Sequence, residues 1–441
     1  MKEPAVFGSH EPKTLAQLAD VASRAERAAL MADGHLGYVM PIGGVAAYRD
    51  RISVVGVGFD IACGNCAIRT DRRIEELTRA DRESIADEIQ DSISFGIGRR
   101  NESGDAPIDD PLFEDPAWDA VPASHREDLR DKARAQLGTV GSGNHYVDIF
   151  ADETGSLWVG VHFGSRGLGH TVASGFLALS QGREWGERVP EAEALLDVGS
   201  PLGHDYWTLM ELAGRYAYAG REWVARKAAS ILGGAEVDLV HNHHNFGWRE
   251  KHRGETLIVV RKGATPAFPG QRGFVGGSMG DDSVILRGSA DAAARELQEA
   301  ALFSTVHGAG RVMSRSEAAG RMKRHKVWAC GRRDCPGRLP KETPRGGEGT
   351  NPRCPLCGSK MFRREVRERK SAGKVTPEMM AAWLAERGVT LRGGGLDESP
   401  HAYRRLPDVL AAQGPTIEIE HVLRPLVVVM AGADEYDPYK D

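Results

Sequence analysis

Two spacings of apolar residues alternate along the chain, and each predicts a different kind of element. Apolar side chains recur every three or four positions in residues 14–31, 73–90, 203–232 and 376–388, which predicts amphipathic helices. The third helix should end at Gly233, because glycine readily adopts the left-handed conformation that closes a helix. Each helix is expected to turn its apolar face towards a core.

Shorter apolar runs, bounded by glycine and polar residues, predict strands between these helices. Such runs occupy residues 256–261 and 283–287, and residues 417–432 are predicted to form a pair of strand-like segments. Similar runs lead into glycine turns within residues 52–70 and 157–170. Loops that leave strand ends often carry functional residues, so these turns are the first places to look for chemistry.

The composition is that of a folded protein, with 41% hydrophobic and 27% charged residues among 441. This length suits two or three average domains or one large domain. A net charge of −5 means that any phosphate polymer must bind a local patch of the surface. No apolar run approaches the roughly 18 residues that a bilayer span needs, and the N-terminus lacks a signal pattern. We therefore expect a cytoplasmic protein that does not engage a membrane.

Four of the six cysteines form two close pairs. Four residues separate Cys330 from Cys335, two separate Cys354 from Cys357, and an 18-residue loop rich in proline and glycine joins the pairs. In an intracellular protein this spacing predicts a structural zinc ribbon with four cysteine ligands. Basic residues gather on both sides of it. They suggest contact with RNA or DNA, although a solvated charged surface explains such clusters equally well.

Asp60 and Cys63 lie where an apolar run enters a glycine bend. Carboxylate and thiolate are both ligands of first-row metals, and a thiolate is soft enough for zinc- or manganese-like sites. Cys63 and Cys66 also form a C-x-x-C pair, which invites a redox or zinc interpretation. A buried free cysteine is the third alternative at this position.

Histidines stand at the ends of three predicted strands. His145 follows a Gly-Ser-Gly turn, His162 precedes a glycine turn, and His307 follows a short apolar run. One such histidine would be unremarkable, whereas three suggest a shared site. Tyr146 and Asp148 alternate along the strand after His145. They can stack on and hydrogen-bond a purine, or they can belong to an ordinary half-exposed strand.

The stretch FSTVHGAGRVMSR, residues 303–315, combines a histidine with two glycines and an arginine. Gly308 and Gly310 allow close approach of a ligand, and a helix predicted to start at Arg311 would offer free N–H groups to an anion. His307 is then placed as a nucleophile towards phosphorus, with Arg311 as a phosphate-binding fork. The alternative is a glycine loop with a merely hydrogen-bonded histidine.

Together these segments supply ligands for two neighbouring metal ions if the Cys63 thiolate bridges them. The candidate ligands are Asp60, Cys63, His145, His162 and His244. Two adjacent cations neutralise phosphate and activate a leaving group. A Gly276-Gly277-Ser278 turn adds backbone amides and a hydroxyl of the kind that hold a nucleotide.

The same motifs resemble those of the RtcB-type RNA ligases. The resembling stretches are DGHLGYVMPIGG, GVGFDIACGN, GTVGSGNHYVDI, VHFGSRGLGH, HHNFGWREKHRGE, RKGATPAFPG, GSMGDDS, STVHGAGRVMSR and DESPHAYRR, from about residue 31 to 432. The resemblance implies an α+β catalytic core of mixed sheets and helices. It also implies a GTP- and Mn²⁺-dependent RNA ligase of RNA repair or tRNA splicing. Such an enzyme joins an RNA 3′-phosphate or 2′,3′-cyclic phosphate to a 5′-hydroxyl, with an archease-like activating protein as a further partner.

Residue roles follow from the same resemblance. Asp60, Cys63 and His145 would hold one Mn²⁺, and Cys63, His162 and His244 the second. His307 would carry GMP as a phosphoramidate. The guanylate site would be lined by Asn144, Tyr146, Asp148, Asn245, Gly277, Ser278, Met279, Ser283, Gly308, Ala309 and Gly310. Arg166 and Arg311 would bind RNA phosphate.

The chain departs from the family pattern at two nucleotide-contacting positions and in its insert. Asp148 replaces a guanine-reading glutamate, and Met430 replaces a lysine near the C-terminus, where Lys440 stands on an added tail. We expect a catalytic core in residues 1–325 and 371–441, the latter with a polar tail, and an inserted zinc ribbon in 326–370. Two alternatives remain open: a metal-dependent RNA phosphodiesterase or end-healing hydrolase, and a non-catalytic RNA-binding protein.

Overall fold

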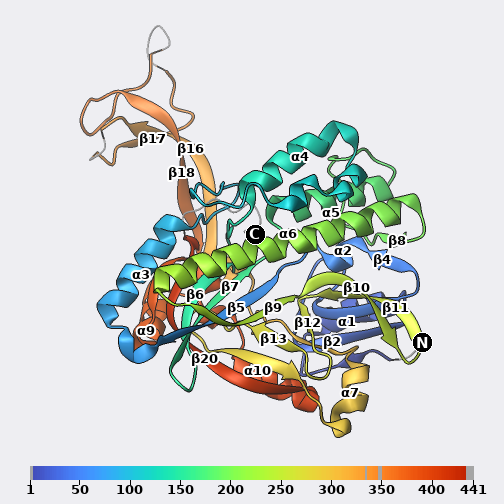
Figure 1. Cartoon of the computed structure of the whole chain (residues 1–441). Coiled ribbons are helices and arrows are strands. Elements are labelled where there is room, and N and C mark those ends of the chain that lie inside the picture. Colours follow the sequence, from blue (N-terminus) through green and yellow to red (C-terminus); the bar gives the residue numbers. More distant parts are fainter. Residues whose placement is uncertain (1–2, 333–334, 346–349, 434–441) are drawn as a thin grey trace.

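The computed structural model describes residues 3–332, 335–345 and 350–433 of the chain. Helices and several β-sheets are mixed along the sequence, which confirms the predicted α+β class. Figure 1 shows a broad core, in which helices cover the sheets, and a narrow arm that projects from it. Across the described residues, none of the helices combines the length and the apolar character that crossing a lipid bilayer requires.

The larger sheet contains eight strands. Its main path runs β13 (Arg272–Val275), β14 (Ser283–Gly288), β20 (Ile417–Gly432), β6 (Tyr146–Ala151), β7 (Ser156–Phe163), β5 (Gly64–Arg73) and β9 (Glu236–His243). The eighth strand, β19 (Thr390–Gly394), pairs in parallel with β20, whereas β6, β7, β5 and β9 pair antiparallel. Neighbouring strands therefore come from distant parts of the sequence.

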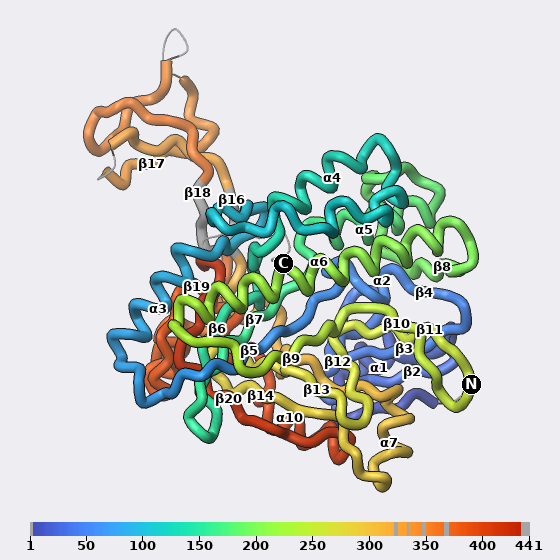
Figure 2. The backbone as a smooth tube through the Cα atoms, in the orientation of Figure 1, coloured from blue at the N-terminus to red at the C-terminus, as the bar shows by residue number. Residues whose placement is uncertain are grey.

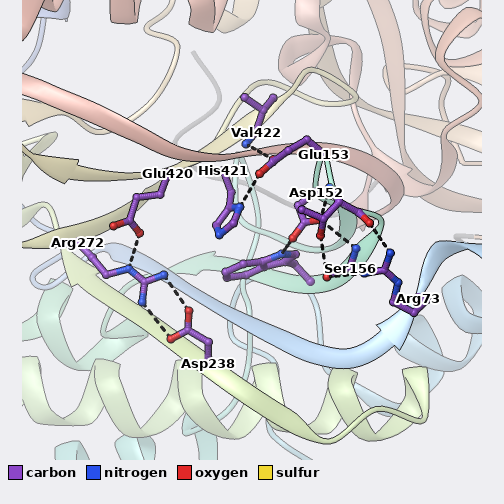
Figure 3. A network of polar contacts seen from close by, with 11 residues as sticks. Arg73, Asp152, Glu153, Ser156, Asp238, Arg272, Glu420, His421 and Val422 are labelled. Carbon is purple, nitrogen blue, oxygen red and sulfur yellow. Dashed lines mark hydrogen bonds and ion pairs between the residues drawn. The ribbon is translucent and has the colours of Figure 1, made fainter.

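Side chains join the two ends of this sheet. Asn242 on β9 accepts a hydrogen bond from the backbone N–H of Phe274 on β13 at 2.9 Å, and Asn65 on β5 donates to the Phe274 carbonyl at 2.8 Å. Arg272 on β13 forms an ion pair with Asp238 on β9 at 2.8 Å (Figure 3). The sheet therefore curls towards a barrel. Its interior residues are Ala67, Phe150, Trp158, Val240, Phe274, Ile285 and Leu423.

The smaller sheet has five strands, and one of them, β10, directly follows a strand of the larger sheet in the sequence. Its order is β1 (Ala5–Val6), β2 (Arg27–His35), β3 (Ile42–Tyr48), β11 (Glu255–Lys262) and β10 (Asn245–His252). β9 of the larger sheet ends at His243 and β10 of the smaller sheet begins at Asn245, so His244 lies at the junction. The strands predicted at 256–261 and 283–287 are confirmed as β11 and β14.

Helices and two short strand pairs complete the core. Besides α6 (Pro201–Leu232) and α8 (Arg315–Ala319), the α-helices of the described residues are α1 (Pro12–Ala22), α2 (Val54–Val57), α3 (Arg79–Ser92), α4 (Ala123–Gln136), α5 (Arg166–Ser180), α7 (Arg295–Ala300), α9 (Pro377–Arg387) and α10 (Leu406–Gln413). β4 (Arg51–Ser53) pairs with β8 (Leu195–Asp197), and β12 (Ala264–Pro266) pairs with β15 (Ser304–Val306). The predicted helix at 376–388 is confirmed as α9, which begins after Thr376 and ends before Gly388.

The longest helix, α6 (Pro201–Leu232), confirms the helix predicted for residues 203–232. The Ser200 hydroxyl caps it by accepting a hydrogen bond from the Gly203 N–H at 3.1 Å, and Gly233 ends it with a φ of 76°. Its buried face packs along β5 and β7 (Figure 1). α6 therefore supports β5, which begins directly after the candidate metal ligand Cys63, and β7, which carries the candidate ligand His162.

The single helix predicted for residues 14–31 is wrong in its second half. The helix α1 ends at Ala22, and the strand β2 begins at Arg27. Residues 28–34 are all buried, so this run is apolar on both faces rather than on one stripe. Such a continuous run is typical of a strand covered on both sides.

Two other predicted elements also differ from the structure. Residues 417–432 form one strand, β20, whose register shifts between Pro425 and Val427, because proline lacks the N–H that a regular ladder needs. The helix expected to start at Arg311 is α8 (Arg315–Ala319), which begins four residues later and is capped by Ser314. The turn after His307 is therefore formed by loop residues.

The arm consists of residues 320–372. β16 (Gly320–Cys330) pairs with β18 (Met361–Ala372) along its whole length, and β17 (Arg338–Pro340) adds a third strand at the distal end. Figure 2 shows this hairpin leaving the core as two adjacent strands and widening at its tip. The predicted polar tail and Lys440 lie outside the described residues.

Candidate active site

A cavity of about 410 Å³ opens where the two sheets meet. It is lined by Asp60, Cys63, His145, His162, His244, His307 and Arg311, and by Asn144, Tyr146, Asp148, Asn245, Gly277, Ser278, Met279, Gly308, Ala309 and Gly310. The strand-end residues that the sequence analysis selected are thus brought together, although they come from segments spread over most of the chain. Arg166 and Ser283 do not line this cavity.

One group of possible metal ligands consists of Asp60, Cys63 and His145, whose ligand atoms all lie within 4.8 Å of one another. Asp60 Oδ2 is 3.2 Å from His145 Nε2, and Cys63 Sγ is 3.8 Å from the same nitrogen. Burial opposes the charged form of Asp60, but His145 and Arg166 outweigh it and lower the pKa of Asp60 to about 2. The carboxylate is therefore in the form that binds a cation.

A second group, Cys63, His162 and His244, shares the same thiol and the same distance limit of 4.8 Å. His162 Nε2 is 3.7 Å from Cys63 Sγ, and its Nδ1 is 2.6 Å from the amide oxygen of Asn65. Asn65 thus fixes the ring and leaves Nε2 directed at the thiol. Burial lowers the pKa of His162 and His244 well below the usual value, so both rings are neutral, as metal ligands must be.

Cys63 is the member common to both groups, and its environment would stabilise a thiolate only if a cation were bound beside it. Burial, together with Asp60, raises the pKa of its thiol well above the usual value. A coordinated metal ion reverses this effect and holds the sulfur as a thiolate. The buried Nδ1 of His244 also has no hydrogen-bond partner in the described structure. These features fit two metal ions that share the sulfur.

Cys66 does not belong to this site. It is fully buried among aliphatic residues of the core under α6, and burial raises the pKa of its thiol to about 12. Cys66 lies three positions after Cys63, on strand β5. Because side chains on a strand alternate between its two faces, this odd spacing directs the two thiols to different sides. The geometry therefore does not favour reading the C-x-x-C pair as a redox or zinc motif.

His307 is held by a buried carboxylate from the other end of the sequence. Its Nδ1 lies 2.6 Å from Asp33 Oδ2, and the same oxygen accepts hydrogen bonds from the backbone N–H groups of His307 at 2.9 Å and Gly308 at 3.2 Å. Although burial opposes ionisation, His307 lowers the pKa of Asp33. A carboxylate oxygen at this distance favours the tautomer with the proton on Nδ1, in which Nε2 retains the lone pair that a nucleophile needs.

Only one of the two glycines in this turn is required by the backbone. Gly310 has a φ of +73°, and a Cβ there would lie 2.4 Å from the Asp33 carbonyl oxygen. A Cβ at Gly308 would meet nothing closer than the Gly276 carbonyl oxygen at 3.5 Å. Gly310 therefore lets the turn approach β2 closely, whereas Gly308 keeps the cavity beside His307 open.

One wall of the cavity presents buried polar atoms that lack partners. The Tyr146 hydroxyl, Asp148 Oδ1 and the Ser278 hydroxyl are all buried and unpaired in the described structure. Burial raises the pKa of Asp148 well above its usual value. Buried polar atoms are normally hydrogen-bonded, so this wall fits a polar ligand such as a nucleobase and ribose. Met430 lies in the same wall and adds no charge.

Residues 14–333 match the family model described as tRNA-splicing ligase RtcB. The chain belongs to the RtcB family. It is 32% identical over 368 residues to a protein of Archaeoglobus fulgidus named tRNA-splicing ligase RtcB, covering 68% of this chain and 75% of that protein. It is also 32% identical over 317 residues to RNA-splicing ligase RtcB of Escherichia coli K12, covering 66% and 75%.

A third RtcB relative, the tRNA-splicing ligase RtcB of Thermococcus kodakarensis, is 31% identical over 385 residues, covering 70% of this chain and 78% of that protein. The RtcB family match includes every cavity residue named above except Met430, and it ends at residue 333 within the arm. Three of the four arm cysteines, Cys335, Cys354 and Cys357, therefore lie beyond the matched residues.

The four cysteines of the arm meet at its distal end. Cys330 Sγ is 3.4 Å from Cys357 Sγ, Cys335 Sγ is 3.6 Å from Cys354 Sγ, and all four lie within 4.8 Å of one another. Four thiolates bound tetrahedrally at about 2.3 Å would be about 3.8 Å apart. The observed spacing thus fits a single zinc ion.

The three remaining predicted residues play supporting roles in the structure. The Ser283 hydroxyl accepts a hydrogen bond from the Gly277 N–H at 2.9 Å. This bond holds the turn that places Ser278 in the cavity wall. Arg166 lies behind His145, with Nη1 3.2 Å from its Nδ1. Arg311 lines the cavity but forms an ion pair with Glu398 at 3.0 Å.

Several residues of this RtcB site were missed by sequence reasoning. The sequence analysis assigns no role to Asp33, although it is an acid at the end of an otherwise apolar run. It also assigns no role to Glu398, which is 4% exposed and lies 3.4 Å from Arg315, another cavity residue. Tyr403 also lines the cavity and contacts Glu398.

Arg221 was missed as well, and it supports the metal ligands from behind. This α6 residue is fully buried and donates to the carbonyls of Ala62 at 2.8 Å and Phe163 at 2.6 Å. It also contacts His241 and His243, each at 2.8 Å. Arg221 therefore fixes the two backbone segments that carry Cys63 and His162.

Proposed function

We propose that this protein is an RNA ligase that joins an RNA 3′-phosphate end to a 5′-hydroxyl end through a covalent His307–GMP intermediate. A 2′,3′-cyclic phosphate end would first be opened by water to a 3′-phosphate. The observation that carries the proposal is the placement of His307, whose Nδ1 is held by Asp33 in the same cavity as both three-ligand groups. The names of the relatives support RNA as the substrate.

The reaction divides into three displacements at phosphorus. His307 Nε2 attacks the α-phosphorus of GTP, a P–N bond forms, and pyrophosphate leaves. An oxygen of the RNA 3′-phosphate then attacks the bound GMP, breaks the P–N bond and becomes activated. Finally the 5′-hydroxyl of the second RNA end attacks the 3′-phosphorus and releases GMP, while its proton passes to a base or to solvent.

The residues of the cavity contribute positioning and charge. Asp33 orients the imidazole and stabilises the positive charge that His307 gains as its bond to phosphorus forms. Asp148, Tyr146 and Ser278 offer hydrogen bonds to the nucleotide. We propose that Asp60, Cys63 and His145 hold one Mn²⁺ and that Cys63, His162 and His244 hold another. When bound, these ions would neutralise phosphate charge and stabilise the leaving group.

Nucleotide labelling tests this proposal against its rivals. The protein is incubated with Mn²⁺ and each of the four α-³²P-labelled nucleoside triphosphates, and an acid-labile protein adduct is sought. We expect an adduct with GTP that is lost in His307→Ala, whose metal content should remain that of the wild type. A phosphodiesterase or a non-catalytic RNA-binding protein would form no adduct, and labelling of His307→Ala would refute the assignment of the nucleophile.

A further inference from the structure

Positive charge is concentrated in the arm. Residues 320–372 contain 16 Lys or Arg and five Asp or Glu, which gives a net charge of +11. Because the whole chain carries −5, the other 388 residues carry −16. A zinc ribbon needs four cysteines and a few apolar residues to fold, so folding alone does not explain this separation of charge.

Three cations near the distal end of the arm are available to a partner. Arg338, Lys341 and Arg345 are exposed, and within the described parts of the chain none of the three forms an ion pair. Phe362 is 44% exposed, with the Lys360 ammonium 6.0 Å from its ring centroid. An exposed aromatic ring among cations offers a stacking surface as well as charge.

The base of the arm is continuous with the rim of the cavity. Arg315 lines the cavity and begins α8, and β16 follows α8 without an intervening loop. The returning strand is tied to the same helix, since the backbone N–H of Val375 donates to the Ala318 carbonyl at 3.0 Å. β16 has 11 residues, so the arm extends about 36 Å at roughly 3.3 Å per residue.

We propose that residues 320–372 form a phosphate-binding arm that holds the duplex part of the RNA substrate while its end occupies the His307 cavity. The inference rests on the proposed function for the identity of the polymer. A reach of about 36 Å corresponds to on the order of ten base pairs of duplex from the engaged end. The arm recognises the backbone by charge, because lysine and arginine contacts to phosphate carry no sequence information.

The arm binds RNA, in preference to an acidic protein, for two structural reasons. Its cations follow a long, narrow hairpin that begins at the cavity rim, which matches a linear polymer that must enter the cavity by one end. The surrounding core is acidic overall, so it repels the same polymer elsewhere. The arm therefore supplies affinity that the core cannot supply.

Binding of fluorescent RNA, measured by anisotropy without GTP, tests the arm separately from catalysis. One probe is a hairpin RNA with a 20-base-pair stem and a 3′-phosphate, and the other is a four-nucleotide RNA with the same end, which is too short to reach the distal part of the arm. The arm variant carries Arg338→Gln, Lys341→Gln and Arg345→Gln. The control variant carries Lys13→Gln, Arg183→Gln and Lys251→Gln, which are exposed on the core.

We expect the arm variant to bind the hairpin at least tenfold more weakly, with a salt slope lower by about three, because three phosphate contacts are lost. It should bind the short RNA like the wild type, and the control variant should bind both probes normally. Unchanged zinc content and melting temperature would show that the arm remains folded.

Three results would overturn the proposal: equal hairpin affinity of both variants, equal loss for both RNA lengths, or arm-dependent binding of a DNA hairpin that is tighter than that of the RNA. Labelling of His307 with GTP is measured in parallel. Failure of labelling with intact arm-dependent binding refutes the proposed ligase and leaves the arm in place, whereas the opposite pair of results refutes the arm alone.

Discussion

Asp33 offers the most direct test of the site, because one of its oxygens organises the whole turn that carries His307. That oxygen accepts two backbone hydrogen bonds and lies 2.6 Å from His307 Nδ1. Asp33→Asn preserves the shape and removes the charge. Asp33→Ala removes both. The two replacements therefore separate orientation from electrostatics.

The expected magnitudes follow from the number and kind of contacts. In Asp33→Asn the two backbone N–H groups hold the amide oxygen in place, so the histidine keeps its tautomer and each contact becomes a neutral one. The loss is about 1–1.5 kcal/mol, or on the order of tenfold in the rate of adduct formation. In Asp33→Ala three donors lose their acceptor and the ring is no longer oriented. We expect a loss of about 10³-fold or more, as for other catalytic histidines without their carboxylate.

The assay is single-turnover labelling with α-³²P GTP at saturating Mn²⁺, with bound metal measured for each variant. Both variants should retain the metal content of the wild type, since Asp33 belongs to neither ligand group. Labelling of Asp33→Ala at nearly the wild-type rate would refute the positioning role. Equal, severe losses in both variants would show that the amide rotates and inverts the histidine tautomer, which contradicts the proposed anchoring by the backbone.

Three other predictions test the nucleotide wall, the shared thiol and the buried arginine. Burial raises the pKa of Asp148, and an ionised carboxylate is the better acceptor for guanine N–H groups. Labelling at subsaturating GTP should therefore increase as pH rises through that raised pKa, whereas Asp148→Asn should lack this component. Cys63→Ser should lose most bound Mn²⁺ and Cys66→Ser almost none, as measured by metal analysis after gel filtration, and equal losses would revive the C-x-x-C interpretation. Arg221→Met removes the hydrogen bonds that the guanidinium donates to two buried carbonyls, so urea unfolding should show a loss of about 2–5 kcal/mol, and an unchanged unfolding free energy would contradict the supporting role.

The candidate metal ligands could be predicted from sequence because each one lies in a local motif at a strand end. Asp60, His145 and His162 are each next to a glycine turn, and such turns are visible without a fold. Asp33 could not be found in this way, since its contact to His307 spans 274 residues. β2 and β15 belong to different sheets, and only the packing of one against the other brings Asp33 and His307 together.

The sequence contained a sign that Arg221 is buried, although the sequence analysis did not use it. The apolar stripe of α6 includes Ala213 and Ala217, and Arg221 follows at the next helical position on the same face. A charged residue on a buried stripe is either an error in the assigned helix or a residue with internal partners. Here the partners are two carbonyls and two histidines, which no periodicity identifies.

The separation of charge between core and arm also explains why the cavity contains so little free positive charge. Arg311 and Arg315 both line the cavity, but Glu398 lies 3.0 Å from the first and 3.4 Å from the second, and Glu398 is itself buried. A phosphate at either arginine would have to compete with that carboxylate. The two arginines therefore fit a role in holding the turn after His307, and the proposed metal ions would be the main positive charge facing the reacting phosphates. Since ions bound by acidic and thiolate ligands are partly neutralised, affinity for a long RNA would have to come from outside the cavity, and the exposed cations of the proposed phosphate-binding arm are placed to provide it.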